Sequence, residues 1–87
     1  MAAAEMTETL VKQSFPGLQL KDAIYTVSIT TQNDWVIFDD FKKVLGVYAE
    51  VAASGVKNAC TIDGSTLNKV VFTSATTGAM RVRVWGY

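Results

Sequence analysis

The chain has 87 residues, of which 49% are apolar and 18% charged, and its eight basic and eight acidic side chains give a formal net charge of zero. A chain of this length forms one domain and buries only about 60% of its unfolded surface, so a monomer would be marginally stable. Balanced charge does not direct the domain to nucleic acid or an anionic membrane, and no apolar run approaches the roughly 18 residues that span a bilayer.

The cysteine and histidine content limits how such a domain gains stability. Cys60 is the only cysteine and histidine is absent, which excludes an intrachain disulfide and disfavours a zinc site. Oligomerisation is the remaining route, and the sparsely charged surface favours it. Residues 1–8 carry no basic side chain, unlike a secretory signal, so we expect synthesis in a reducing cytoplasm.

Residues 1–17 are expected to form an N-terminal arm that precedes a β domain over residues 18–87. The pattern of residues 1–13 is weakly helical, and Pro16-Gly17 ends it. This indicates an extended arm or short helix outside the main body, or a loose terminus. The apolar side chains with which an arm would hold a neighbouring subunit are Met6, Leu10, Val11 and Phe15.

From residue 18 onward the sequence has the period of two that is typical of strands. Residues 24–31 place Tyr25, Val27 and Ile29 on one face, residues 32–34 (Gln-Asn-Asp) form a turn, and residues 35–38 form a short apolar strand. Residues 39–43 begin with acids and end with lysines, which predicts one helical turn, closed by Gly46.

The second half of the sequence is expected to be a β meander. Val47, Ala49 and Val51 share one side of a strand, and further strands cover residues 58–62 and 67–73, joined by a hairpin turn at residues 63–66. Together with the last strand, the pattern predicts an all-β fold, a small antiparallel β-sandwich or barrel of about six strands.

The last strand has two distinct faces. Met80, Val82, Val84 and Gly86 alternate with the four candidate interface residues, which are Arg81, Arg83, Trp85 and Tyr87. Arginine and aromatic side chains are enriched in protein interfaces, which favours a contact surface. Two alternatives are a solvent-facing strand whose arginines stack on the rings, and a surface for single-stranded nucleic acid, which the zero net charge disfavours.

No catalytic constellation accompanies these residues. Asp34, Asp39 and Asp40 are the only acidic cluster, and we interpret it as the start of a helical turn in preference to a metal site. Cys60 has no histidine to activate it and is interpreted as a buried structural thiol. We therefore expect no enzyme activity, no catalytic or metal-binding residue and no cofactor.

Two stretches carry a resemblance. Residues 70–87 (VVFTSATTGAMRVRVWGY) and residues 25–31 (YTVSITT) followed by Asp34-Trp35 resemble small virion structural proteins of tailed bacteriophages. The resemblance extends over residues 23–87 and implies a head decoration, or cement, protein on the outside of the capsid. Such proteins are commonly homotrimers at lattice junctions, and many use an N-terminal arm. The implied partners are further copies of the chain and the major capsid protein, with no membrane.

The sequence thus leads to one hypothesis and two alternatives. The hypothesis is a non-enzymatic, oligomeric capsid decoration protein, synthesised in the host cytoplasm and located on the virion surface. A tail or fibre component is the alternative within the same class. A small β-barrel that binds single-stranded nucleic acid through the Arg81, Arg83, Trp85 and Tyr87 face is the alternative from another class.

Overall fold

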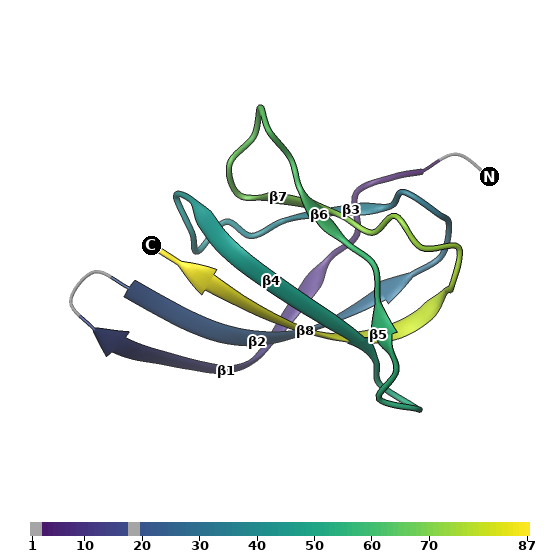
Figure 1. The fold of residues 1–87 in the computed structure, drawn as a ribbon, viewed down its shortest axis with the longest axis horizontal. Coiled ribbons are helices and arrows are strands. Elements are labelled where there is room, and N and C mark those ends of the chain that lie inside the picture. The colour runs from purple at the N-terminus through teal and green to yellow at the C-terminus, as the bar shows by residue number, and fades with distance from the viewer. Residues whose placement is uncertain (1–2, 18–19) are drawn as a thin grey trace.

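The computed structural model describes residues 3–17 and 20–87, with side chains for residues 3–13 and 21–87. It confirms the all-β class, with eight strands rather than six and no helix among the described residues (Figure 1). The strands form two antiparallel sheets. The larger has the order β1 (Glu8–Gly17), β2 (Leu20–Ile29), β8 (Gly78–Gly86), β4 (Val44–Val51) and β5 (Lys57–Asn58). The smaller has the order β3 (Trp35–Ile37), β7 (Lys69–Val71) and β6 (Thr61–Ile62).

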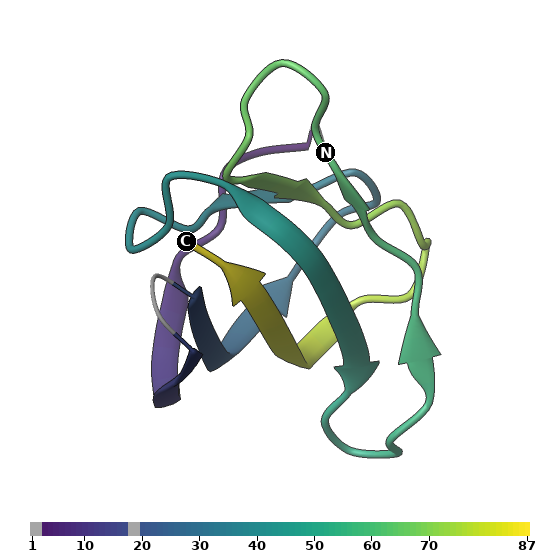
Figure 2. The ribbon, with the colours of Figure 1, turned by 60° about the vertical axis from the view of Figure 1, so that its left-hand side comes forward.

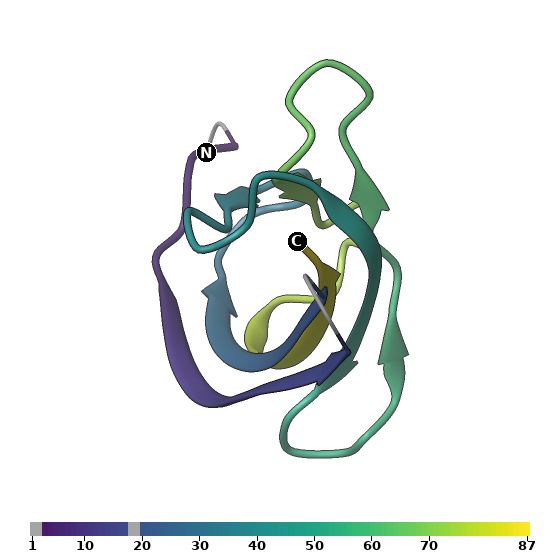
Figure 3. The same cartoon turned by 90° about the vertical axis from the view of Figure 1, so that its left-hand side faces the viewer.

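The two sheets enclose one core. The five-stranded sheet curves around one side of it and the three-stranded sheet lies across the other (Figures 2 and 3). The inward residues of β2 and β8 supply half of the core, as their period of two predicts, and β4, the smaller sheet and the loops supply the rest. The buried apolar residues are Ala23, Tyr25, Val27, Ile29, Val36, Phe38, Phe41, Val44, Ala49, Val70, Phe72, Met80, Val82 and Val84.

The N-terminal segment differs from the expected arm or helix. Residues 8–17 form β1, which pairs antiparallel with β2 and is an edge of the larger sheet. A short parallel bridge joins Glu5 to Trp35, where the Met6 N–H donates to the Trp35 carbonyl at 2.7 Å. Pairing satisfies the backbone groups along the outer side of β2, which a detached arm would leave open. Thr7 and Thr9, which weaken the helical pattern of this segment, favour extended structure.

Asp34 fixes the corner between β2 and β3. Its side chain is fully buried, and its carboxylate accepts hydrogen bonds from the Ala4 N–H at 2.9 Å, the Thr30 N–H at 2.9 Å and hydroxyl at 3.0 Å, and the Thr31 N–H at 2.8 Å. Burial alone would raise the pKa of Asp34, but these hydrogen bonds outweigh it and hold the pKa below its ordinary value. Asn33 takes a positive φ of 72° in the adjoining turn, as expected there.

Residues 39–46 correct a second expectation. They contain a turn, closed by the Phe41 N–H donating to the Phe38 carbonyl at 2.9 Å, and no helix follows it. Phe41 is buried, so core packing holds the chain there in place of a helical ladder. Gly46 does not close this turn but lies within β4, opposite Trp85 of β8.

The expected strand over residues 58–62 is divided between the two sheets. β5 pairs with β4, whereas β6 pairs with β7, so the chain crosses from one sheet to the other at Ala59-Cys60. The hairpin between β6 and β7 is as predicted. The Asp63 carboxylate accepts from the Ser65 N–H at 3.0 Å and the Thr66 N–H at 2.7 Å, which caps the turn.

We predict that Asp34→Asn lowers the free energy of unfolding by about 2 kcal/mol, because the amide loses charge-assisted acceptor capacity and buries donors that lack partners. Urea denaturation at pH 7 measures this. Because the folded-state pKa is depressed, the contribution of Asp34 is fully present above the ordinary aspartate pKa of about 3.9 and is lost as pH falls through the folded value.

The control for this prediction is Asp39→Asn, at an exposed carboxylate in the turn that follows the other end of β3. It should leave the stability at pH 7 unchanged within about 0.5 kcal/mol. Two results would show that Asp34 does not organise this corner. One is an equal loss of unfolding free energy in both variants at pH 7. The other is an Asp34→Asn protein whose unfolding free energy falls with acid as much as that of the parent.

Candidate functional site

The outer face of the five-stranded sheet is the strongest candidate site. The smaller sheet and the loops cover the inner face only, and β8 lies in the middle of the larger sheet between β2 and β4. The alternation expected along β8 is confirmed, because Met80, Val82 and Val84 are fully buried and Arg81, Arg83 and Trp85 are exposed. The arginines and the indole therefore lie at the centre of an open sheet face.

The strand register places one row of mixed chemistry across this face. Arg83 lies opposite Ile24 of β2 on one side and Tyr48 of β4 on the other, and Lys12 of β1 lies opposite Ile24. Side chains that are paired across antiparallel strands share a face and contact one another. The row thus reads cation, apolar, cation, aromatic, and we call Lys12, Ile24, Arg83 and Tyr48 the central row.

Arg83 is held by a carboxylate of the neighbouring strand. Its Nε lies 3.1 and 3.2 Å from the two carboxylate oxygens of Asp22, and its Nη2 lies 2.5 Å from Oδ2. The hydrogen bond from Arg83 lowers the pKa of the Asp22 carboxyl, so the pair stays charged over the neutral range. Arg83 is therefore oriented on the sheet while 60% of its side chain remains exposed.

A second ion pair lies in the adjacent row. Arg81 is opposite Thr26 on β2 and Glu50 on β4, and its Nη1 contacts the Glu50 carboxylate. Lys57 of β5 lies beyond Glu50. Each arginine of β8 is thus neutralised by a carboxylate of a flanking strand. The face therefore carries several charged side chains but little net positive charge.

Trp85 is fixed by a glycine beneath it. Gly46 lies opposite Trp85, and a Cβ built on Gly46 would come within 2.1 Å of the indole Cζ2. The ring therefore lies against the bare backbone of β4, and the Arg83 guanidinium carbon is 5.9 Å from its centroid. Trp85 remains 40% exposed and Tyr48 remains 41% exposed, so two aromatic side chains are available at this surface.

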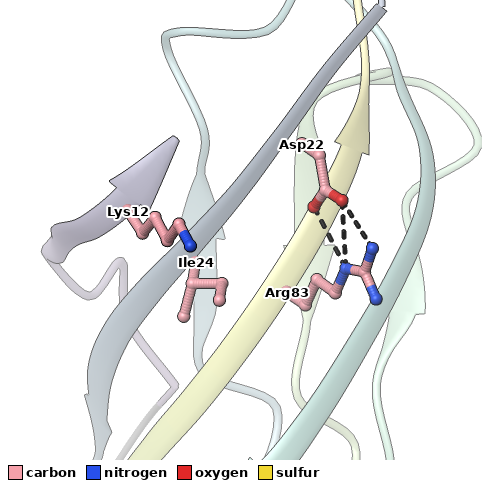
Figure 4. Close-up of a pocket in the computed structure, with 4 residues that line it drawn as sticks. All are labelled: Lys12, Asp22, Ile24 and Arg83. Carbon is pink, nitrogen blue, oxygen red and sulfur yellow. Dashed lines mark hydrogen bonds and ion pairs between the residues drawn. The ribbon is translucent and has the colours of Figure 1, made fainter. Parts of the chain in front are cut away.

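A hollow of about 220 Å³ lies beside these residues on the same face (Figure 4). Lys12, Asp22, Ile24 and Arg83 line it, and they come from three neighbouring strands, β1, β2 and β8. Ile24 forms an apolar floor between the two cations. Two cations and one carboxylate give the hollow one net positive charge.

The other predicted interface residues are not part of this face as a group. Tyr87 is exposed at the end of β8, and its carbonyl accepts from the Lys42 and Lys43 N–H groups. Leu10 and Val11 are exposed on the edge strand β1, whereas Met6 is partly buried against the core. The Phe15 side chain lies outside the described residues.

Sequence reasoning missed Asp22, Ile24, Gly46 and Tyr48. Alternation along β2 and β4 indicates which of their residues face outward, but not which of these lie beside Arg83 and Trp85. That requires the pairing of strands, and the pairs come from distant parts of the chain. No local motif carries this information.

The acidic cluster and Cys60, the other candidates from the sequence, make contacts that stabilise the fold. Asp40 accepts a hydrogen bond from the Tyr25 hydroxyl at 3.1 Å, and burial together with this bond raises the pKa of Tyr25. Cys60 is partly buried against the core, and burial raises the pKa of its thiol. The described residues contain no cluster of three or more potential metal ligands and no helix long and apolar enough to cross a membrane.

Comparisons with protein-family models, with curated proteins and with solved structures give no match for this chain. A functional hypothesis therefore depends on the residues of the site and on the resemblance in the sequence.

We predict that Gly46→Ala displaces the Trp85 ring, because the added methyl group cannot occupy the space of the indole. In a Trp35→Phe background, where Trp85 is the only tryptophan, the emission maximum should move to longer wavelength as the ring becomes more hydrated. The free energy of unfolding should fall by about 1 kcal/mol.

The matched control is Gly64→Ala, because a Cβ on Gly64 meets nothing within 4 Å. It should leave the emission unchanged. If Gly46→Ala also leaves the emission unchanged, the indole does not rest on the β4 backbone.

Proposed function

We propose that this protein is a non-enzymatic structural protein that binds protein partners through the outer face of its five-stranded sheet. The observation that carries the proposal is the fixed placement of Arg83 and Trp85, by Asp22 and Gly46 respectively, at the centre of an uncovered face. Side chains that are exposed yet already oriented lose little conformational entropy on binding. Arginine and tryptophan are also the residue types most enriched among those that dominate interface energetics.

The ion pairs favour a protein partner over nucleic acid. Affinity for a nucleic acid backbone depends on cations that neutralise phosphates. Arg81 and Arg83 already share their charge with Glu50 and Asp22, and the chain has no net charge to add. Binding to a protein surface requires less unpaired positive charge, because the centre of a protein interface is apolar and aromatic and its charges are paired.

The particular form that we propose is a capsid decoration protein of a tailed bacteriophage, assembled as a homo-oligomer. The resemblance of residues 23–87 to small virion proteins supports this form. So does the fold, because a single compact core with a broad open sheet face suits a protein whose task is to hold neighbouring subunits together. Many weak copies on a capsid lattice add up to strong attachment through avidity.

Light scattering over a dilution series to low micromolar concentration tests self-assembly. We expect a stable oligomer, with a trimer as the expected size, and a Trp85→Ala protein that dissociates at about tenfold higher concentration or more, the loss typical of a central interface residue. Leu67→Ala is the matched control, because Leu67 is similarly exposed, at 46% against 40%, and belongs to the β6–β7 hairpin. A monomer at every concentration, or equal effects of the two variants, would contradict self-assembly through this face.

Attachment to the capsid needs a separate measurement. Co-sedimentation with undecorated heads of the encoding phage should saturate at a fixed number of copies per head. It should persist in 0.5 M salt, because salt does not screen the aromatic contacts of Trp85 and Tyr48 and the arginines are already paired with carboxylates. Binding to single-stranded DNA that falls steeply with salt, without binding to heads, would favour the nucleic-acid alternative.

A further inference from the structure

The hollow on the outer sheet face has a composition that selects a ligand class. Its two cations lie on either side of Ile24, Lys12 on β1 and Arg83 on β8. Two strand spacings separate their backbones by about 10 Å, and both side chains are long enough to reach a group placed above Ile24. Figure 4 shows the Lys12 amine close to Ile24 and the Arg83 guanidinium turned to Asp22.

Both cations retain hydrogen-bonding capacity. The ion pairs among the described residues use Arg81 and Arg83, and Lys12 has none there. Arg83 uses Nε and Nη2 on Asp22, and a guanidinium carries five N–H donors, so its Nη1 donors are not taken by that carboxylate. The hollow therefore offers donors of both Lys12 and Arg83 to an acceptor.

The charge of the hollow matches one carboxylate. Lys12 and Arg83 supply two positive charges and Asp22 one negative charge, which leaves a single positive charge to neutralise. A phosphate monoester dianion would leave excess negative charge beside Asp22. A nucleic acid backbone would bring further phosphates onto a face whose other arginine, Arg81, is already paired with Glu50. The apolar floor and the nearby Tyr48 and Trp85 rings further suit a carbon-rich neighbour of that carboxylate.

We propose that the hollow binds the carboxylate of a glutamate or aspartate of a partner protein, with an aromatic side chain of the same segment against Tyr48 and Trp85. This inference rests on the proposed function, since it names the chemistry of the partner at the same face. Arg83 and Lys12 would bind the carboxylate, and Asp22 would position Arg83. The partner is thus recognised by one acidic residue set in an apolar surface, not by a run of acids.

The test uses blocked dipeptides and the full-length protein. N-acetyl-Trp-Glu-amide is titrated into ¹⁵N-labelled protein, and N-acetyl-Trp-Gln-amide, which has the same shape without the charge, is titrated in parallel. We expect the glutamate peptide to shift the Arg83 Nε–H signal and to bind about threefold more tightly than the glutamine peptide, as for a partly exposed ion pair. The difference should shrink as salt rises.

Lys12→Met should abolish most of the preference for glutamate, since methionine keeps the length of the side chain but not its charge. Lys57→Met is the matched control, because Lys57 lies on the same sheet at the opposite edge, beside Glu50. It should leave the preference unchanged. Equal binding of the two peptides, an unchanged preference in Lys12→Met, or tighter binding of a thymidine oligonucleotide at 0.15 M salt would overturn the inference.

The two proposals fail separately. A chain that self-associates through Trp85 but does not distinguish the peptides overturns only the carboxylate site. A chain that prefers the glutamate peptide but remains monomeric overturns only self-assembly and supports the carboxylate site.

Discussion

The structure depends on the double pairing of β8. This strand is hydrogen-bonded to β2 on one side and to β4 on the other, so its inward residues must be apolar and its outward residues stand at the centre of a sheet face. One run of nine residues therefore supplies Met80, Val82 and Val84 to the core and Arg81, Arg83 and Trp85 to the candidate site. A change that shifts its register by one residue would invert both.

The fold class was predictable from the sequence because alternation is a local property. The faces of β2 and β8 follow from the spacing of their valines and aromatic residues, and the Asp63 turn follows from side-chain chemistry. The N-terminal strand was not predictable in the same way, because its own alternation is weak and its pairing with β2 determines its strand conformation. The turn at residues 39–43 had helical charges, but the burial of Phe41 decided its conformation.

The candidate site shows the same division. Arg81, Arg83 and Trp85 could be named from the last strand alone, and Tyr87 with them. The residues that give them their properties could not, because Asp22 and Arg83 are 61 residues apart in the chain, and Gly46 reaches Trp85 only through the β4–β8 pairing. An exposed arginine is a common surface feature. Arg83, by contrast, is held by Asp22 beside a tryptophan that lies on glycine backbone, so its side chain would lose little conformational entropy in a contact.

The central position of β8 also has a kinetic consequence. Until Gly78–Gly86 is available, β2 has a partner only in β1, and β4 has one only in the two residues of β5. The core also lacks Met80, Val82 and Val84. The pairings that complete the domain close long loops, which makes folding slow compared with that of a helical bundle of similar size. A truncated chain lacking this strand should therefore be unable to fold at all, and the exposed backbone edges of β2 and β4 would make it prone to aggregate.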